Sequence, residues 1–366
     1  MTKTKKMTPK IGITKIPFYQ GGLAGPSEEK GILKLSANEN PYGPSPKAIR
    51  AYSLASKKLA LYPNSDHWFL RKAIADYFGL DFEKIICGAG SDELIHMLCQ
   101  CYAGRGDQVI HTEHGFAMYR ISALSMGATP VKVEEHNRCA NVEAILEACN
   151  EKTKLIFIAN PNNPTGTMVH SECIEKLVDR APKSALVVLD GAYAEYIQNF
   201  DAGAEYVGSR ENVFMLRTFS KIFGLGSLRV GWGYGSTHVI NALLRVKPPF
   251  NVSTPAQEAA QAALQDIEHI DKCRVENEFW RNWLSSKLHD IGLPSDPSYG
   301  NFILIRLRDV FSANSAYKFL IGRGIFVRKV DIYGLPNSLR ITIGKGKDCR
   351  KVLEALKIFQ ESNDGL

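Results

Sequence analysis

A single lysine lies within an apolar, glycine-rich segment that runs from residue 218 to residue 232. Burying an ammonium group is costly and lowers its pKa toward the neutral amine. A neutral amine can attack a carbonyl carbon and form a Schiff base. This residue, Lys221, directly follows Ser220 and precedes Arg229 by eight residues. A hydroxyl and a planar guanidinium suit a phosphate, so the segment can hold an aldehyde that carries a phosphate. The alternative is a surface lysine on a loop.

Pyridoxal 5'-phosphate (PLP) carries both groups, and three further motifs suit its other edges. Asp190 ends an apolar run, where a carboxylate can keep a pyridine nitrogen protonated so that the ring accepts electrons. Tyr193, three residues later, and Asn163, in a proline-flanked turn, can donate to a ring oxygen. Ser91 follows a glycine-rich turn and opens a helix, whose free N–H groups suit a phosphate. Taken singly, these motifs are equally typical of helix caps and turns.

The elements that must position these residues alternate along the chain. The apolar runs 155–159 and 185–189 predict strands that are buried on both faces. Strand–helix alternation predicts an α/β fold with a mostly parallel sheet between helices. Ligands bind beyond the carboxyl ends of such strands, where the polar residues above are found. The expected strands are 85–87, 108–111, 129–133, 155–159, 185–190, 213–216 and 230–233.

The pattern changes after residue 235, which predicts a second, smaller α+β domain. A turn-rich break at 247–252 precedes a long helical region from 254 to 290. Strands are expected at 302–305 and 339–343, and a last helix at 347–360. Arg340 needs an anion if it points inward, whereas pointing outward would make it an ordinary solvated residue. We expect an N-terminal arm at 1–44 that contributes to the small domain and dimer contacts. A large PLP-binding domain would span 45–246 and the small domain 247–366.

Composition excludes several classes of protein. The net charge of +7 is spread along the chain without a basic helix, so we expect no nucleic-acid partner. We find neither a run of about 18 apolar residues nor a signal-peptide pattern, so we expect no membrane segment. The eight scattered cysteines suggest reduced thiols in a cytoplasmic protein, and their spacing predicts no metal site.

In their order along the chain, these motifs resemble fold-type I PLP-dependent aminotransferases, and most closely histidinol-phosphate aminotransferases. The resemblance extends from about residue 17 to the last helix. The matching segments are Asn38-Glu39-Asn40-Pro41, Gly43-Pro44-Ser45-Pro46, Tyr62-Pro63, Gly90-Ser91-Asp92-Glu93, Phe116 with Met118-Tyr119, Asn163-Pro164-Thr165-Gly166, Asp190 with Ala192-Tyr193, Ser220-Lys221 through Arg229, and Leu339-Arg340-Ile341-Thr342.

The resemblance implies a role for each matching residue around PLP. Lys221 corresponds to the Schiff-base lysine and proton shuttle, and Asp190 to the partner of the pyridine nitrogen. Asn163 and Tyr193 match the residues that hold the ring oxygen. Phe116 occupies the position where an aromatic ring stacks on the cofactor. The residues that match the phosphate cup are Ser91, Asp92, Ser220 and Arg229.

Other matching residues imply a substrate site and a second subunit. Tyr62 resembles the tyrosine that reaches the phosphate from the neighbouring subunit, which implies a homodimer. Arg340 matches the arginine that binds a substrate carboxylate, or the substrate phosphate in histidinol-phosphate enzymes. Arg328 resembles a second arginine for that phosphate. Tyr19 and Asn38 are expected to line the substrate pocket.

Two positions depart from the family pattern. Many relatives have Asp-Glu-Ala-Tyr, whereas Gly191 stands here in place of the glutamate. Many have a proline before the stacking aromatic, whereas this chain has His114-Gly115-Phe116. Neither change removes a catalytic group.

The resemblance implies transamination between L-histidinol phosphate and 2-oxoglutarate, giving imidazole acetol phosphate and L-glutamate in histidine biosynthesis. An aromatic amino acid aminotransferase is one alternative, because Arg340 would bind a carboxylate equally well. A threonine-phosphate decarboxylase would use similar motifs. A PLP-binding regulator is a further alternative, but the first forty residues are too short and turn-rich for a DNA-binding module.

Overall fold

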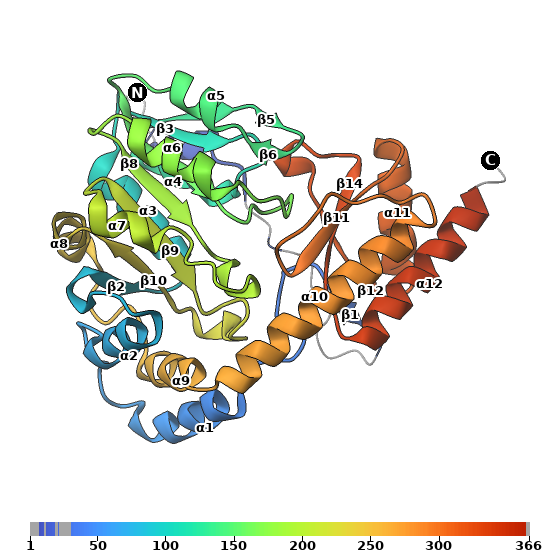
Figure 1. The fold of residues 1–366 in the computed structure, drawn as a ribbon, viewed down its shortest axis with the longest axis horizontal. Helices are drawn as coiled ribbons and strands as arrows, with labels where there is room; N and C mark the ends of the chain where they lie inside the picture. The colour runs from blue at the N-terminus through green and yellow to red at the C-terminus, as the bar shows by residue number, and fades with distance from the viewer. Residues whose placement is uncertain (1–6, 11, 19–20, 22–30, 364–366) are drawn as a thin grey trace, which may run out of the picture.

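The computed structural model describes residues 7–10, 12–18, 21 and 31–363. A seven-stranded sheet lies at the centre of the larger part of the molecule (Figure 1), with strand order β2-β10-β9-β8-β7-β3-β4. Strand β10 is antiparallel to both neighbours, and the neighbouring pairs from β9 to β4 are parallel. The predicted mostly parallel sheet is therefore confirmed. The strands are β2 (Ile85–Gly88), β3 (Gln108–Thr112), β4 (Thr129–Val133), β7 (Thr153–Ala159), β8 (Leu186–Asp190), β9 (Val213–Thr218) and β10 (Gly231–Gly235).

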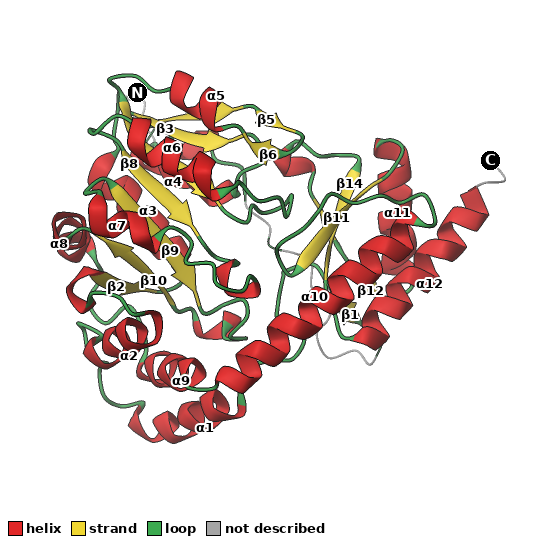
Figure 2. Ribbon diagram, viewed as in Figure 1, coloured by secondary structure: helices red, strands yellow, loops and turns green. Residues whose placement is uncertain are grey.

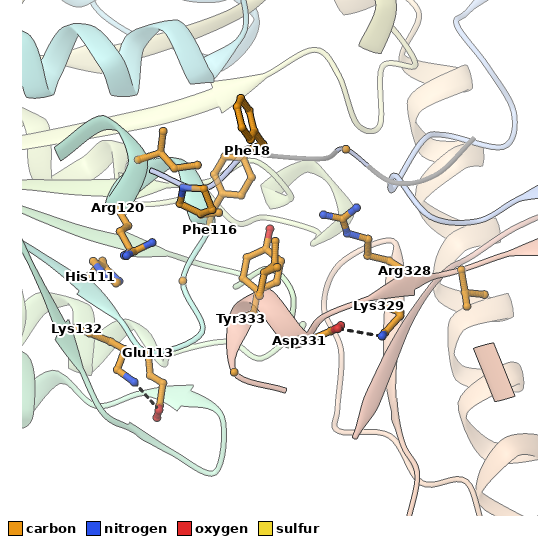
Figure 3. A pocket seen from close by; sticks show the side chains of 18 of the residues that line it. Phe18, His111, Glu113, Phe116, Arg120, Lys132, Arg328, Lys329, Asp331 and Tyr333 are labelled. Atoms are coloured by element: carbon orange, nitrogen blue, oxygen red, sulfur yellow. Dashed lines mark hydrogen bonds and ion pairs between the residues drawn. The ribbon is translucent and has the colours of Figure 1, made fainter. Parts of the chain in front are cut away.

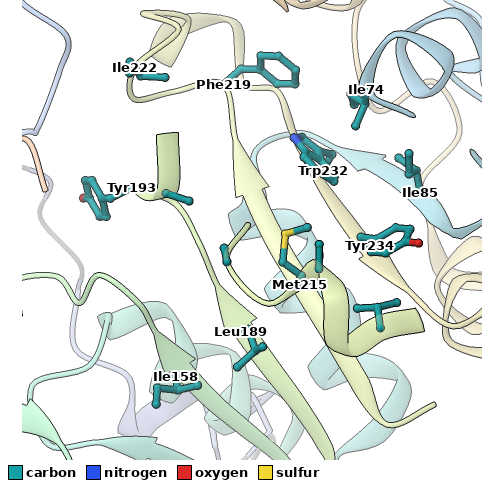
Figure 4. Packing of buried hydrophobic residues seen from close by; sticks show 14 of the residues in the cluster. Ile74, Ile85, Ile158, Leu189, Tyr193, Met215, Phe219, Ile222, Trp232 and Tyr234 are labelled. Carbon is teal, nitrogen blue, oxygen red and sulfur yellow. The ribbon is translucent and has the colours of Figure 1, made fainter. Parts of the chain in front are cut away.

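Helices cover both faces of this sheet (Figure 2), because successive strand residues point to opposite sides. Val188 and Phe214 pack with the helices α3, α4 and α8, while Leu189 and Met215 belong to the opposite cluster with α2, α6 and α7 (Figure 4). The bounds are α2 (Trp68–Phe78), α3 (Ser91–Tyr102), α4 (Ala117–Met126), α5 (Val142–Glu147), α6 (Ser171–Arg180), α7 (Ala204–Ser209) and α8 (Thr237–Val246). A short hairpin joins β5 (Glu135–His136) to β6 (Cys139–Ala140).

A second, smaller sheet forms the other part of the molecule, with strand order β11-β14-β13 and antiparallel pairing throughout. Helices pack against it around a core of their own. An N-terminal strand joins this part of the molecule by pairing in parallel with β12. The bounds are β1 (Leu33–Lys34), α10 (Ile267–His289), β11 (Phe302–Arg306), α11 (Val310–Gly322), β12 (Ile325–Phe326), β13 (Arg328–Lys329), β14 (Ser338–Thr342) and α12 (Gly346–Asn363).

Two helices that pack in the larger core begin with the same sequence pattern, a serine cap followed by a proline. Helix α1 (Pro46–Ala55) begins after Ser45, and α9 (Thr254–Leu264) begins after Ser253. Each serine accepts a hydrogen bond from a backbone N–H of the first turn, and a proline occupies that turn. Helix α9 packs on α1 and α2, within the core of the large sheet. The division at residue 246 stays a prediction, but α9 belongs by its packing to the larger part.

The long helical region expected from 254 to 290 consists of two helices, α9 and α10, because the chain breaks at Gln265 and Asp266. Helix α10 contacts a buried ion pair, in which Arg217 donates to Glu195 at 3.0 Å, because Arg274 of this helix donates to the Glu195 backbone carbonyl at 2.8 Å. Among the described residues, no helix is long and apolar enough to cross a membrane.

Candidate active site

The loops that follow five strands of the large sheet converge on one cavity. These strands are β2, β3, β7, β8 and β9, and their carboxyl ends lie along one edge because their directions agree. The cavity brings together nine predicted residues: Ser91, Asp92, Phe116, Asn163, Asp190, Tyr193, Ser220, Lys221 and Arg229.

Asp190 is the buried acid of this cavity, with 4% of its surface exposed. Its Oδ2 accepts a hydrogen bond from the Tyr119 hydroxyl at 2.7 Å, and its Oδ1 accepts one from the Ala192 backbone N–H at 3.0 Å. Burial raises the pKa of Asp190 to about 6, although the bond from Tyr119 and the charge of Lys221 act in the opposite direction. A cation placed beside this carboxylate would therefore offset the free-energy cost of burying its negative charge.

Tyr193 is held by a chain of hydrogen bonds from the smaller sheet. Its hydroxyl oxygen accepts from Asn38 Nδ2 at 2.9 Å. The Asn38 amide is itself fixed by Thr342 on β14, whose hydroxyl donates to Asn38 Oδ1 at 3.2 Å and accepts from the Asn38 backbone N–H at 3.0 Å. This arrangement leaves the Tyr193 hydroxyl hydrogen to be donated into the cavity.

Asn163 has one amide atom fixed in the same way. Arg340 Nη1 donates to Asn163 Oδ1, and Arg340 Nη2 donates to the Ser36 carbonyl at 2.9 Å. With its oxygen engaged, Asn163 presents its NH₂ group as a donor. Tyr193 and Asn163 can therefore both donate to one ligand oxygen, and Arg340 sets the orientation of the second donor.

The opposite end of the cavity is suited to a phosphate. Helix α3 begins at Ser91, so its free N–H groups and the positive end of its dipole face the cavity. Arg229 donates to Ser220 Oγ at 3.3 Å and to Asp92 Oδ2 at 3.1 Å. Gly90 has φ +84°, and a Cβ added there would lie 2.5 Å from Arg229 Nη2. Only glycine therefore leaves the guanidinium in this place.

Lys221 projects from a segment that is anchored on both sides. The next two side chains, Ile222 and Phe223, are almost fully buried in the large core. Lys221 is half-buried rather than fully enclosed, and its Nζ lies 5.5 Å from the centre of the Tyr193 ring. The amine is thus rigidly supported yet reachable from the cavity.

Arg328 and Arg340 lie directly opposite each other on two neighbouring strands of the smaller sheet. They are directly paired residues of β13 and β14, so their side chains leave the same face. Like charges directly opposite one another are destabilising. Arg340 is 5% exposed and donates to oxygens of Asn163 and Ser36. Arg328 and Phe116 line one pocket (Figure 3), and an anion bound there beside Arg328 would be attracted by both charges.

Comparison with known proteins decides the family. The family model described as "Aminotransferase class I and II" matches residues 30–356. The chain belongs to this aminotransferase family. A histidinol-phosphate aminotransferase of Ruegeria sp. (strain TM1040) is 54% identical to it over 97% of this chain and 98% of the relative. One of Dinoroseobacter shibae is also 54% identical, over the same shares.

Solved structures place this aminotransferase in fold type I. The crystal structure of histidinol-phosphate aminotransferase from Sinorhizobium meliloti in complex with pyridoxal-5'-phosphate has a TM-score of 0.90 and 25% identity, covering 98% of this chain and 99% of that one. A Thermus thermophilus aspartate aminotransferase has a TM-score of 0.80 at 22% identity, covering 91% and 98%, and shares the fold. The chain is therefore a PLP-dependent aminotransferase.

The cavity of this aminotransferase fits the cofactor on two independent observations. The desolvated Asp190 carboxyl is suited to a protonated ring nitrogen, because that cation would stabilise its ionised form. The space kept open by Gly90 beside Arg229, at the start of α3, is suited to a phosphate. Residues that would hold PLP thus lie at both ends of one cavity, and Lys221 also lines this cavity.

Two predicted residues have other surroundings, and a third is not described by the structure. Tyr62 is 82% exposed and stacks on Phe250 with ring centres 4.6 Å apart, so it does not line this cavity in its own chain. Asn38 lies behind Tyr193 and is 1% exposed, and its contact with substrate stays a prediction. Tyr19 lies outside the described residues.

Sequence reasoning gave no role to two residues that the geometry makes important. Tyr119 belongs to one of the matching segments without a role of its own there, but it is fully buried and donates to Asp190. Thr342 fixes Asn38 from a strand 304 residues away. The glycine at 191 has a local reason, because a Cβ there would lie 2.5 Å from the Ala202 Cβ. A larger residue at 191 would require Ala202 to move.

Proposed function

We propose that this aminotransferase transfers the amino group of L-histidinol phosphate to 2-oxoglutarate, giving imidazole acetol phosphate and L-glutamate in histidine biosynthesis. The names of its relatives at 54% identity support this substrate. The structural observation that carries it is the facing pair Arg328–Arg340. Two guanidinium groups on one face match a phosphate, which carries up to two negative charges, better than a single carboxylate.

The position of this pair relates the substrate anion to the reacting centre. Arg340 bonds Asn163, which faces the cofactor cavity, so an anion bound to Arg340 is one side chain away from that cavity. A substrate held at its phosphate would present its amino group toward Lys221. Holding both ends of the substrate reduces the entropy lost on reaching the reactive arrangement.

Each polar residue of the cavity has a task in this reaction. Bound PLP supplies an electron sink for the carbanion formed when the substrate loses its Cα proton. Lys221 would accept that proton on Nζ and donate it to C4' of the cofactor. Asp190 holds the proton on the ring nitrogen, while Tyr193 and Asn163 donate to the ring oxygen. Arg340 and Arg328 bind the phosphate of the first substrate, and Arg340 binds a carboxylate of 2-oxoglutarate in the second half-reaction.

We further propose a homodimer in which Tyr62 of one subunit reaches the phosphate end of the neighbouring cavity. Tyr62 stacks on the exposed Phe250, and the side chains of Leu59 and Leu61, just before it in the chain, are exposed as well. A large exposed apolar group is typical of an interface. Mixing Lys221→Ala and Tyr62→Ala chains tests this arrangement, because each mixed dimer would contain one intact site. Activity that does not recover on mixing would contradict it.

The alternative substrates are separated by steady-state selectivity. We expect kcat/KM for histidinol phosphate to exceed that for tyrosine and phenylalanine with 2-oxoglutarate as acceptor. Arg328→Leu should reduce this value for histidinol phosphate much more than for phenylalanine, which has no phosphate. A clear preference of the parent enzyme for the unphosphorylated amino acids would favour the aromatic aminotransferase, because Arg340 can bind a carboxylate. Release of carbon dioxide from threonine phosphate would favour the decarboxylase.

The cellular location is also a proposal. All eight cysteines lie in the described part of the chain and are free thiols. Such thiols suit a reducing compartment, and we propose the cytoplasm.

A further inference from the structure

His114 joins the two parts of the molecule at a point close to both binding sites. It lies between β3 and α4, two residues before Phe116, and is 7% exposed. Its Nδ1 lies 2.6 Å from the backbone carbonyl oxygen of Tyr333, 219 residues along the chain. Because a carbonyl oxygen can only accept, this Nδ1 carries the hydrogen. Tyr333 ends a short 3₁₀ helix, η6 (Asp331–Tyr333), that follows β13.

The loop that carries His114 is also fixed on the side of the large sheet. The backbone N–H of His114 donates to Glu135 Oε1 at 3.1 Å. Glu135 begins the β5–β6 hairpin, and burial raises its pKa while the charge of His114 acts in the opposite direction. The loop that carries His114 is therefore held to the larger part of the molecule by the bond to Glu135. The imidazole connects this loop to the smaller part through its hydrogen bond to Tyr333.

Close packing surrounds this hydrogen bond. Leu304, Val330, Tyr333 and Leu335 form a small apolar cluster, against which Ala117 at the start of α4 packs. A Cβ added to Gly334 would lie 3.6 Å from both Nδ1 and Cε1 of His114, so the ring lies beside the η6 backbone. The apolar contact stabilises the association of the two segments but does not fix their relative orientation, because the hydrophobic effect is non-directional. The His114–Tyr333 hydrogen bond restrains that orientation, because it requires a defined distance and angle.

The two segments joined here carry one residue of each binding site. On the large-sheet side, Phe116 lines the cofactor cavity two residues after His114. On the other side, Arg328 lies five residues before Tyr333, and β13 pairs it with Arg340. Figure 3 shows Phe116, Tyr333 and Arg328 around the same pocket.

We propose that His114 is a positioning residue that holds the Phe116 loop at a fixed distance from the segment carrying Arg328. The cofactor face and the substrate-anion site then keep the separation that one substrate molecule must span. This inference rests on the proposed function only for the identity of the anionic substrate.

The matched variants are His114→Asn and His114→Gln. The amide nitrogen of asparagine can occupy nearly the place of imidazole Nδ1, whereas that of glutamine extends toward the place of Nε2. Asparagine should keep the bond to the Tyr333 carbonyl, and glutamine should lose it. Losing one buried hydrogen bond predicts roughly a tenfold rise in KM for histidinol phosphate. The kcat should change little, because the groups at the reacting centre remain.

A second readout follows the cofactor directly. Circular dichroism of bound PLP in the visible range depends on how Phe116 packs on the ring, so it should change in His114→Gln and not in His114→Asn. Thermal unfolding of both variants shows whether each is folded. If His114→Gln does not fold, His114→Ser replaces it, because serine is too short to reach Tyr333.

The outcomes separate this inference from the proposed function. A parent enzyme that prefers phenylalanine overturns the substrate assignment, but the dichroism difference between the two variants still supports His114. The positioning role is overturned if asparagine and glutamine give the same KM and the same spectrum. It is also overturned if the loss in His114→Gln is confined to kcat.

Discussion

Replacing Asp190 by asparagine should stabilise the cofactor-free protein at neutral pH while abolishing transamination. Burial raises the pKa of Asp190 from 3.8 to about 6, a difference that corresponds to about 3 kcal/mol. Because the pKa in the folded state lies above that in the unfolded state, the protonated carboxyl favours folding. This stabilisation is complete below pH 3.8 and is lost as the pH rises through about 6. Above that pH the native carboxylate retains the full desolvation cost, which an asparagine does not have.

Urea denaturation of the two cofactor-free proteins measures this cost. From about pH 4.5 to about pH 8, the stability difference should change by about 2 kcal/mol in favour of Asp190→Asn. One amide oxygen cannot accept from both Tyr119 and Ala192, which costs about 1 kcal/mol at every pH. The change with pH, rather than the absolute difference, is therefore the quantity to measure.

The control and the cofactor-bound protein complete the test. Asp92→Asn removes a carboxylate from the same cavity, but its side chain is 42% exposed and so carries less desolvation. With PLP bound, a protonated ring nitrogen should offset the cost at Asp190, and the native protein should become the more stable of the two. A stability difference that stays constant with pH would refute the argument.

Three further changes have expected outcomes. Lys221→Ala should abolish both transamination and the visible absorbance of lysine-bound PLP, and turnover at the native rate would contradict the mechanism. Thr342→Val should release the Asn38 amide and shift the pH at which that absorbance changes by about one unit, whereas Thr342→Ser should not; absorbance titration compares them. Arg217→Met should destabilise the fold by about 3–5 kcal/mol because Glu195 stays buried and charged, and adding Glu195→Gln should recover part of this in denaturation experiments.

The sequence predicted most of the cofactor cavity because its residues follow strands. Asp190 is the last residue of β8 and Asn163 lies four residues after the end of β7. Neighbouring parallel strands bring these ends together whatever the details of packing. Local pattern placed these residues at one edge of the sheet, and the family resemblance implied their roles. Local pattern also located β11 and β14 within one residue of their observed bounds.

Contacts between distant segments could not be predicted in this way. The bonds of Thr342 to Asn38 and of His114 to Tyr333 depend on how the smaller sheet docks against the larger one, which no local periodicity records. The pairing of β1 with β12 joins segments 292 residues apart and involves only two residues of each. Tyr119 differs from an ordinary core aromatic only through its contact with Asp190.

The placement of Arg328 and Arg340 on the smaller sheet has a consequence for how such an enzyme diversifies. In the proposed function, the groups that carry out the chemistry belong to loops of the large sheet, whereas the two arginines that bind the substrate anion belong to one hairpin-sized stretch near the end of the chain. On that assignment, we expect recombination or mutation confined to residues 328–340 to alter substrate choice and leave the reaction intact. The bond from Arg340 to Asn163 sets the limit of this independence, since any replacement for Arg340 must still orient that amide.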